Sequence, residues 1–160
     1  MRARQLAEEF PTVTPDSAAM EAARLLAEHR LPGLIVVDER RHPKAVLPGS
    51  QLLRAVIPGY VQDDLALARV YDEGHADKLT ESLRGKTVAD VLPRTADRTP
   101  PPVVDADATA MEIASVMAAA RSPVVVVTGD AHRTDAPMIG VITVSRLLTR
   151  LLATGSGPSP

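Results

Sequence analysis

The chain has 160 residues, enough for one compact domain or for two small lobes that share a core. Its 18 basic and 20 acidic residues leave a net charge of −2, which excludes the strongly basic surface typical of proteins that bind nucleic acid. Cysteine is absent and aromatic residues make up 2% of the chain. Disulfides, cysteine-ligated zinc and an aromatic platform for stacked bases are therefore excluded as well.

The chain also lacks the sequence features of a membrane or exported protein. No apolar stretch approaches the roughly 18 residues that a membrane span needs, and the first residues do not resemble a signal peptide. We therefore expect a cytoplasmic protein without membrane insertion.

The first predicted elements are a short strand at residues 12–14, a helix from about residue 19, and a strand at residues 34–37. We expect Asp16 or Ser17 to cap the helix and Pro32 to end it. The apolar run of the second strand is typical of a strand covered on both faces. The helix places apolar residues on one face at the spacing i, i+3, i+4, i+7: Ala19, Ala22, Ala23 and Leu26.

A turn, a third strand at residues 45–47 and a helix starting near Ser50 complete the first set of elements. Residues 59–85 then form a polar, helix-friendly stretch, which we interpret as a helical insertion. Its end is predicted at Gly85, a residue common at helix C-termini.

The second half of the chain repeats the first. Residues 13–36 align with residues 104–127 without a gap, and ten of the 24 aligned positions are identical. Four extra residues in the second copy change the offset, after which residues 45–53 align with residues 140–148. Two matches in the same order indicate an internal duplication.

The second copy has the same predicted elements, and the sequence at the start of its helix has a clearer N-terminal capping motif. Thr109 is followed three residues later by Glu112, which is the spacing of a capping box. Pro123 ends the helix, and the run of valines at residues 124–127 predicts a second buried strand. On this helix the apolar face consists of Ala110, Ile113, Ala114 and Met117.

These patterns predict an α/β (α+β) fold made of two β-α-β-β-α repeats that pack together, because one such unit alone would bury too little surface. The predicted boundaries are residues 1–58 for the first repeat, 59–85 for the insertion and 86–152 for the second repeat. Residues 153–160 are rich in Gly and Pro and are predicted to be a disordered tail.

The repeated stretches "TVTPDSAAMEAARLLAEHRLPGLIVVD" with "AVLPGSQLL", and "PVVDADATAMEIASVMAAARSPVVVV" with "GVITVSRLL", resemble a stand-alone tandem pair of cystathionine-β-synthase (CBS) domains, also called a Bateman module. The resemblance implies two repeats related by a pseudo-twofold axis, with two clefts that commonly bind AMP, ADP, ATP or S-adenosylmethionine. It also implies a homodimer and a regulatory role on an enzyme or transporter, without catalysis or a required cofactor.

In the family's ligand motif, a Ser or Thr at the end of a strand is followed three residues later by an Asp that accepts from the ribose hydroxyls. Here Thr143 holds the hydroxyl position, but Arg146 stands in place of the Asp. In the first copy Pro48 and Gln51 occupy these two positions. The resemblance therefore favours the second cleft, with these candidate nucleotide-binding residues: Val103, Val104, Pro123, Val124, Val125, Thr143, Ser145 and Arg146.

The residues themselves leave alternatives open. Ser145 could cap the last helix instead of contacting a ligand, and Arg146 could form a surface salt bridge instead of facing a phosphate. With both Asp positions changed, the module could also be a dimerising scaffold that has lost its ligand. No nucleophile with an acid–base partner and no metal-ligand spacing is present, so we expect neither an enzyme nor a metal site.

A surface for protein partners is predicted on the last helix. Its apolar side chains are typical of a face that needs covering: Leu147, Leu148, Leu151 and Leu152.

Overall fold

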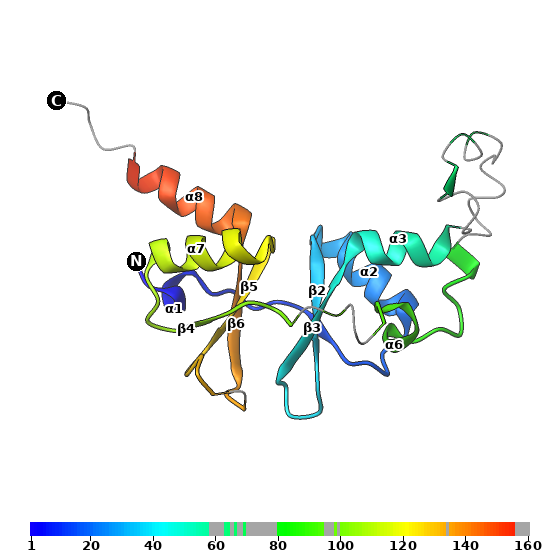
Figure 1. The fold of residues 1–160 in the computed structure, drawn as a ribbon, viewed down its shortest axis with the longest axis horizontal. Helices are drawn as coiled ribbons and strands as arrows, with labels where there is room; N and C mark the ends of the chain where they lie inside the picture. The colour runs from blue at the N-terminus through cyan, green and yellow to red at the C-terminus, as the bar shows by residue number, and fades with distance from the viewer. Residues whose placement is uncertain are drawn as a thin grey trace. The chain divides into compact units, whose positions relative to one another are not determined.

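A computed structural model describes residues 1–57, 63, 64, 66, 69, 80–94, 98, 100–133 and 135–155. Figure 1 shows the elements along the chain. In order they are α1 (Ala3–Leu6), β1 (Thr12–Val13), α2 (Ala19–His29), β2 (Gly33–Val37), β3 (Pro43–Pro48), α3 (Gly49–Val56), α6 (Val88–Val91), β4 (Val103–Asp105), α7 (Ala110–Ala120), β5 (Val124–Thr128), β6 (Met138–Thr143) and α8 (Val144–Gly155).

The strands form two three-stranded sheets with the orders β1-β2-β3 and β4-β5-β6. In each sheet the first two strands are parallel and are joined by a crossover helix, α2 or α7. Strands β5 and β6 are antiparallel. The two β-α-β-β-α repeats and the mixed α/β class predicted from the sequence are confirmed.

The middle strands are the most buried parts of the sheets. All five residues of β2 and all five of β5 are buried. This agrees with the continuous apolar runs in the sequence, since a strand with a solvated face would alternate with polar residues.

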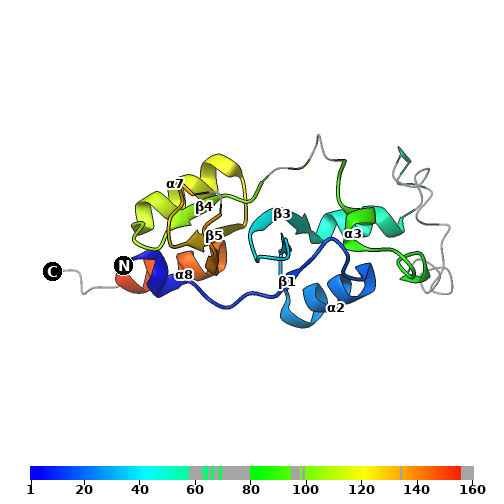
Figure 2. The ribbon, with the colours of Figure 1, turned by 90° about the horizontal axis from the view of Figure 1, so that it is seen from below.

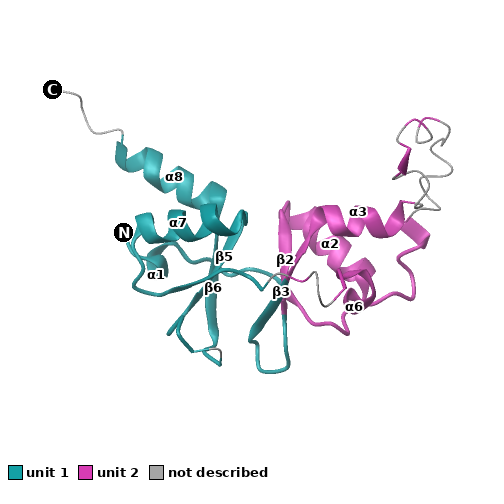
Figure 3. Ribbon diagram, in the orientation of Figure 1, with its two compact units in different colours: residues 1–11, 37–45, 100–160 teal, residues 12–36, 46–99 magenta. Residues whose placement is uncertain are grey.

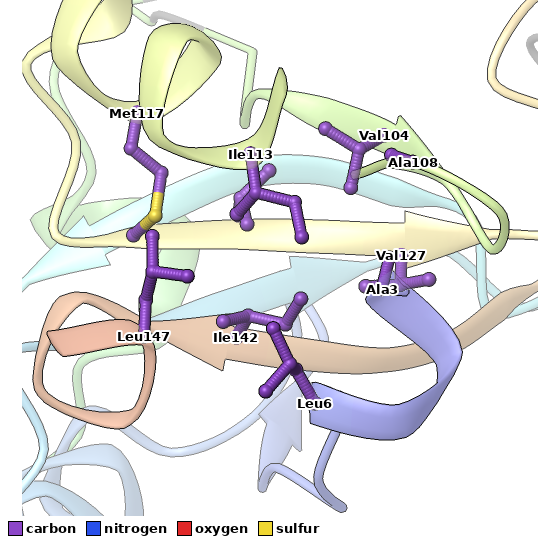
Figure 4. Packing of buried hydrophobic residues seen from close by; sticks show 10 residues of the cluster. Ala3, Leu6, Val104, Ala108, Ile113, Met117, Val127, Ile142 and Leu147 are labelled. Atoms are coloured by element: carbon purple, nitrogen blue, oxygen red, sulfur yellow. The ribbon is translucent and has the colours of Figure 1, made fainter. Parts of the chain in front are cut away.

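An apolar cluster stabilises the sheet β4-β5-β6. Figure 4 shows that it joins side chains of α7, the sheet, the start of α8 and the short helix α1. Its members are Ala3, Leu6, Val104, Ala108, Ile113, Met117, Val125, Val127, Ile142 and Leu147. The N-terminal residues are thus part of the core of the second repeat, which the sequence analysis did not predict.

The chain divides into two compact units that do not coincide with the sequence repeats. Unit 1 contains residues 1–11, 37–45 and 100–160, and unit 2 contains residues 12–36 and 46–99 (Figure 3). The predicted boundaries at residues 58 and 86 therefore describe the duplication in the sequence, whereas the compact units interleave segments of the two copies.

Residues 1–11, here named the N-terminal arm, dock on the second repeat through their backbone. The amides of Ala3 and Arg4 donate to the carbonyls of Ala108 and Ala106, both at 2.9 Å. The side chain of Arg4 also pairs with Asp107. In Figure 2 the dark blue N-terminal residues lie with α7 and α8 of the same unit.

Residues 80–94, here named the linker arm, dock on the first repeat in the corresponding way. The amide of Val88 donates to the carbonyl of Ser17 at 2.8 Å, and the amide of Ala19 donates to the carbonyl of Lys86 at 2.9 Å. Each arm therefore precedes one repeat in the chain and packs on the other.

This docking explains why the predicted cap of α2 is wrong. Neither Asp16 nor Ser17 caps the helix; its N-cap is Ala18, which makes no side-chain hydrogen bond. The free amide of Ala19 at the helix start is satisfied by the linker arm instead, through the carbonyl of Lys86. In α7 the predicted capping box of Thr109 and Glu112 is confirmed, with distances of 2.6 and 3.3 Å.

Helices α2 and α7 end in the same conformation. Arg30 and Arg121 adopt left-handed backbone angles, with φ of 51° and 50°. Both helices thus end three residues before the prolines that were predicted to end them, because a left-handed residue already turns the chain away from the helix axis.

Two sequence predictions concern segments at the edge of the described structure. Most of the predicted insertion at residues 59–85 lies outside the described residues; its last part contains Leu83, which is buried in unit 2. Of the predicted tail, residues 153–155 belong to α8 and residues 156–160 lie outside the described residues.

Candidate functional site

The candidate site lies at one end of the sheet β4-β5-β6, where β5 begins and β6 ends. Val124 and Thr143 are partners in the antiparallel pair, and Val103 is the partner of Val126 on β4. The amide of Val144 donates to the carbonyl of Pro123 at 3.0 Å, which ties the start of α8 to the start of β5. The residues predicted around Thr143 are therefore brought together locally.

Strand alternation divides the predicted valines between two faces. Val104 and Val125 belong to the apolar core under α7 and α8, so their side chains do not face a ligand. Val103, Val124 and Thr143 lie on the opposite face, because neighbouring residues of a strand point to opposite sides of the sheet. Only the backbone groups of Val104 and Val125 could therefore contact a ligand.

The hydroxyl of Thr143 caps α8. Its Oγ1 accepts from the backbone amide of Arg146 at 3.1 Å, so Thr143 and not Ser145 performs the capping that the sequence left open. The hydroxyl of Thr143 can still donate its hydrogen. Ser145 is exposed, and among the described residues its hydroxyl has no hydrogen-bond partner.

Arg146 is directed to the N-terminal arm. Its Nε lies 3.3 Å from Oε1 of Glu8, in a pair whose side chains are 31% and 48% exposed. This separation makes an ion pair, but the buried Nε forms no hydrogen bond in the described part of the chain. The salt-bridge alternative for Arg146 is thus observed, with a partner that the sequence analysis did not consider.

The equivalent positions of the first repeat show a matching geometry without the hydroxyl. The amide of Gly49 donates to the carbonyl of Pro32 at 3.2 Å, and Pro48 is the N-cap of α3 without a side-chain hydrogen bond. Nε2 of Gln51 donates to the carbonyl of Val91 in the linker arm at 3.1 Å. In both repeats the residue at the family's Asp position therefore contacts the docked arm.

A family model for the CBS domain matches residues 3–58 and 88–153 of the chain. The chain belongs to the CBS domain family. None of the curated proteins compared with this CBS pair matches it significantly.

Solved structures of other CBS proteins have the same fold. A CBS domain-containing protein from Kribbella flavida is 48% identical, with a TM-score of 0.80 over 95% of this chain and 99% of that chain. CBSX2 from Arabidopsis thaliana is 20% identical, with a TM-score of 0.69 and 98% of each chain covered. CBSX2 in complex with AMP has a TM-score of 0.64 at 20% identity, over 96% of this chain and 98% of that chain.

A fourth similar structure is the CBS domain of a bacterial CNNM/CorC family Mg2+ transporter. It is 18% identical, with a TM-score of 0.63 over 99% of this chain and 78% of that chain.

Each unit of this CBS pair has a hollow lined by described residues. One of about 570 Å³ lies in unit 1 beside β4 and the start of α7, with Asp105, Glu112 and His132 among its lining residues. Of the predicted site residues only Val103 and Val104 line it. The hydrogen bonds from Thr109, first from its amide and then from its hydroxyl, lower the pKa of Glu112, so this part of the hollow keeps a negative charge at neutral pH.

The other hollow, of about 620 Å³, lies in unit 2 between α3 and the linker arm. Gln51 lines it together with Arg54, Lys86, Asp90 and Arg94. Sequence reasoning missed the residues of both arms, because it assigned residues 1–11 to the first repeat and residues 86–94 to the second, whereas each of these segments packs on the other repeat. The short helices α1 and α6 each lie just ahead of one repeat in the chain. This shared position could have indicated a shared role.

The described residues contain no group of three or more His, Asp or Glu side chains that could hold a metal ion. Within the same residues no helix is long and apolar enough to cross a membrane. Nδ1 of His42 lies 3.2 Å from Oδ2 of Asp38.

Proposed function

We propose that this CBS pair is a regulatory module that binds an adenine-containing nucleotide, such as AMP, ADP, ATP or S-adenosylmethionine, and thereby modulates a partner protein. The ligand contacts would lie at the sheet end of the second repeat. The observation that carries the proposal is the pair of hydroxyls at the junction of β6 and α8, where Thr143 can donate and Ser145 is exposed.

The structure of CBSX2 in complex with AMP supports this choice of ligand class, since it has the same fold. The apolar residues at this end of the sheet also suit a flat, weakly polar base. Pro123, which precedes the strand partner of Thr143, is exposed, and Val103 on the far strand β4 is half-buried. The first repeat is a weaker site, because Pro48 has no hydroxyl to offer and Gln51 is engaged with Val91.

An enzyme or transporter is the partner class that we propose. A CBS domain similar in fold belongs to an Mg2+ transporter of the CNNM/CorC family, which supports a regulatory arrangement of this kind. We infer a regulatory and not a catalytic role, because the proposed site has hydroxyls but no base within hydrogen-bond distance of them in the described residues.

Thermal denaturation with a nucleotide panel tests the proposal. A ligand at 100 times its Kd should add about 2.7 kcal/mol to the free energy of unfolding and raise the melting temperature. Replacement Thr143→Val should weaken nucleotide binding roughly two- to tenfold, because one hydrogen bond to the ligand is lost. The shift is read against each variant's own ligand-free melting temperature, which removes the effect of the lost helix cap.

The control is Thr149→Val on α8, whose hydroxyl bonds the carbonyl of Ser145 within the helix. This variant should bind nucleotide like the wild type. If AMP, ADP, ATP and S-adenosylmethionine all leave the melting temperature unchanged, the sensor proposal is wrong. If Thr143→Val binds a confirmed nucleotide as tightly as the wild type, the site has been placed in the wrong position.

A second candidate function is a homodimeric scaffold. It is favoured by the contacts of Gln51 and Arg146 with the arms, since both residues stand where the family has its ribose-reading Asp. Apolar side chains on α8 that remain exposed form the surface for it: Val144, Leu148, Leu151 and Leu152. The prediction that Leu147 belongs to this surface is wrong, because Leu147 lies in the core and is 4% exposed.

Dimerisation through α8 can be measured by native mass spectrometry and sedimentation. We expect the wild type to be a dimer and Leu148→Glu to be a monomer, since a charge at a half-exposed apolar position opposes burial in an interface. Thr149→Glu, an exposed neighbour on the same helix, should remain a dimer. A monomeric wild type would contradict the dimer, and a dimeric Leu148→Glu would place the interface elsewhere.

A further inference from the structure

Glu8 is held on the second repeat by its backbone. Its amide donates to the carbonyl of Val141 at 3.0 Å, and its carbonyl accepts from the amide of Val141 at 3.0 Å. The N-terminal arm can come this close because the neighbouring residue of β6 is Gly140. A Cβ at Gly140 would lie 2.9 Å from the carbonyl oxygen of Glu8 and 3.0 Å from Cβ of Ala7.

This backbone pairing fixes the side of the sheet on which the carboxylate of Glu8 emerges. Residues that face each other in an antiparallel bridge point to the same face, so Glu8 and Val141 share one face. Val141 and Thr143 share it too, because side chains alternate along a strand. Ile142, between them, points into the core on the other face.

The carboxylate of Glu8 therefore lies on the face of the candidate site, beside the first turn of α8. Its Oε1 is 3.3 Å from Nε of Arg146, the residue at the position where the family has its Asp. The Glu8 side chain is 48% exposed, and no other polar partner for it occurs among the described residues. One carboxylate oxygen thus faces Arg146, and the other remains able to accept hydrogen bonds.

We propose that Glu8 supplies the carboxylate that recognises the ribose in this chain, in place of the missing Asp at position 146. This inference rests on the proposed nucleotide-binding function and adds to it a preference for ribonucleotides. The 2′- and 3′-hydroxyls of the ribose donate to Glu8, and Arg146 stabilises the negative charge of the carboxylate. The N-terminal arm is then part of the ligand site, although it precedes the first repeat in the chain.

Calorimetric titration with AMP and with 2′,3′-dideoxy-AMP tests this assignment. The wild type should bind AMP roughly ten- to a hundredfold more tightly than the dideoxy analogue, the range expected for hydrogen bonds to a charged acceptor. Glu8→Gln should lose most of this preference, because the amide group accepts with one oxygen and carries no charge. Glu9→Gln, an exposed neighbour, is the matched control and should keep the wild-type preference.

Glu8→Asp distinguishes the effect of the carboxylate charge on binding from the effect of the side chain on the packing of the arm. It keeps a carboxylate on a side chain one carbon shorter, so it should retain part of the preference for AMP that Glu8→Gln loses. Melting temperatures of the variants, measured in parallel, report whether the arm stays docked. Loss of the preference in Glu8→Gln with an unchanged melting temperature supports recognition by Glu8.

The outcomes for this inference and for the proposed function are distinct. A wild type that binds no adenine nucleotide contradicts the proposed function, and the role of Glu8 fails with it. A wild type that binds AMP but not more tightly than the dideoxy analogue overturns the role of Glu8 alone. The same conclusion follows if Glu8→Gln keeps the full preference for AMP.

Discussion

Replacement Leu6→Ala is expected to destabilise the protein by about 2–5 kcal/mol, the range for removing a large aliphatic side chain from a packed core. Leu6 is 1% exposed and belongs to the apolar cluster that also contains Ile113 and Ile142. It lies on a helix of four residues, which is too short to be stable without tertiary packing. The loss should therefore release the N-terminal arm as well as lower the melting temperature.

Two measurements check this expectation. Thermal melting should show a decrease on the order of 10 °C for a chain of this size. Limited trypsin digestion should show faster cleavage after Arg4, which the docked arm holds through its backbone bond to Ala106. The matched control is Ile139→Ala, which removes a side chain of similar volume that is 52% exposed and should change stability by less than about 0.5 kcal/mol.

Equal melting temperatures for Leu6→Ala and Ile139→Ala would contradict the packing of the arm. In that case the N-terminal residues would be an attached segment without a role in the core, and the position of Glu8 beside Arg146 would have no structural support.

Replacement Gly140→Ala is expected to destabilise the protein by about 1–3 kcal/mol, the usual cost of inserting an atom where the backbone leaves no space. The new Cβ would lie 2.9 Å from the carbonyl oxygen of Glu8 and 3.0 Å from Cβ of Ala7, and the first of these is backbone that cannot rotate away. Relief requires the arm to move from β6, which breaks both hydrogen bonds between Glu8 and Val141.

The melting temperature and the nucleotide affinity should therefore fall together in Gly140→Ala, since the same movement removes Glu8 from the site. Gly129→Ala is the control, because a Cβ there has no atom within 4 Å and the backbone angle does not require glycine. If Gly140→Ala melts like Gly129→Ala, the close approach of the arm to β6 is not a feature of the protein in solution.

The first copy of the repeat has Ala45 at the position aligned with Gly140. This difference follows from the partners of the two arms. Counted from the starts of α1 and α6, the residue of the linker arm that corresponds to Glu8 is Pro93. Proline has no amide hydrogen for a strand-like bridge. The linker arm makes only the contacts that both arms share, between its short helix and the residues before the crossover helix, and the sheet position there carries a side chain.

Much of the fold could be predicted from the sequence because the responsible interactions are local or repeated. The capping box of Thr109 and Glu112 spans three residues, and the valine run of β5 shows in its composition that both faces are covered. The duplication adds independent support, since each copy predicts the same order of elements. Periodicity also assigned Ile113 and Met117 correctly to the buried face of α7.

The candidate site was predictable only in part. The strand end at Thr143 could be recognised from its motif, but the role of Thr143 as a helix cap competes with ligand binding at the same hydroxyl. The sequence did not reveal that Val104 and Val125 face the core, because a run of valines has no polar residue to mark the two faces of the strand.

By itself the sequence determined the two repeats, the order of their elements and the position of the hydroxyl at the end of β6, since these depend on short-range patterns. Only the tertiary structure decided that each arm docks on the other repeat, that Ala19 is capped by Lys86, and that Glu8 meets Arg146. The physical reason is that these contacts join residues far apart in the chain, and that backbone groups dock the arms, cap Ala19 and place Glu8 on β6. A backbone amide or carbonyl is the same at every position of a sequence.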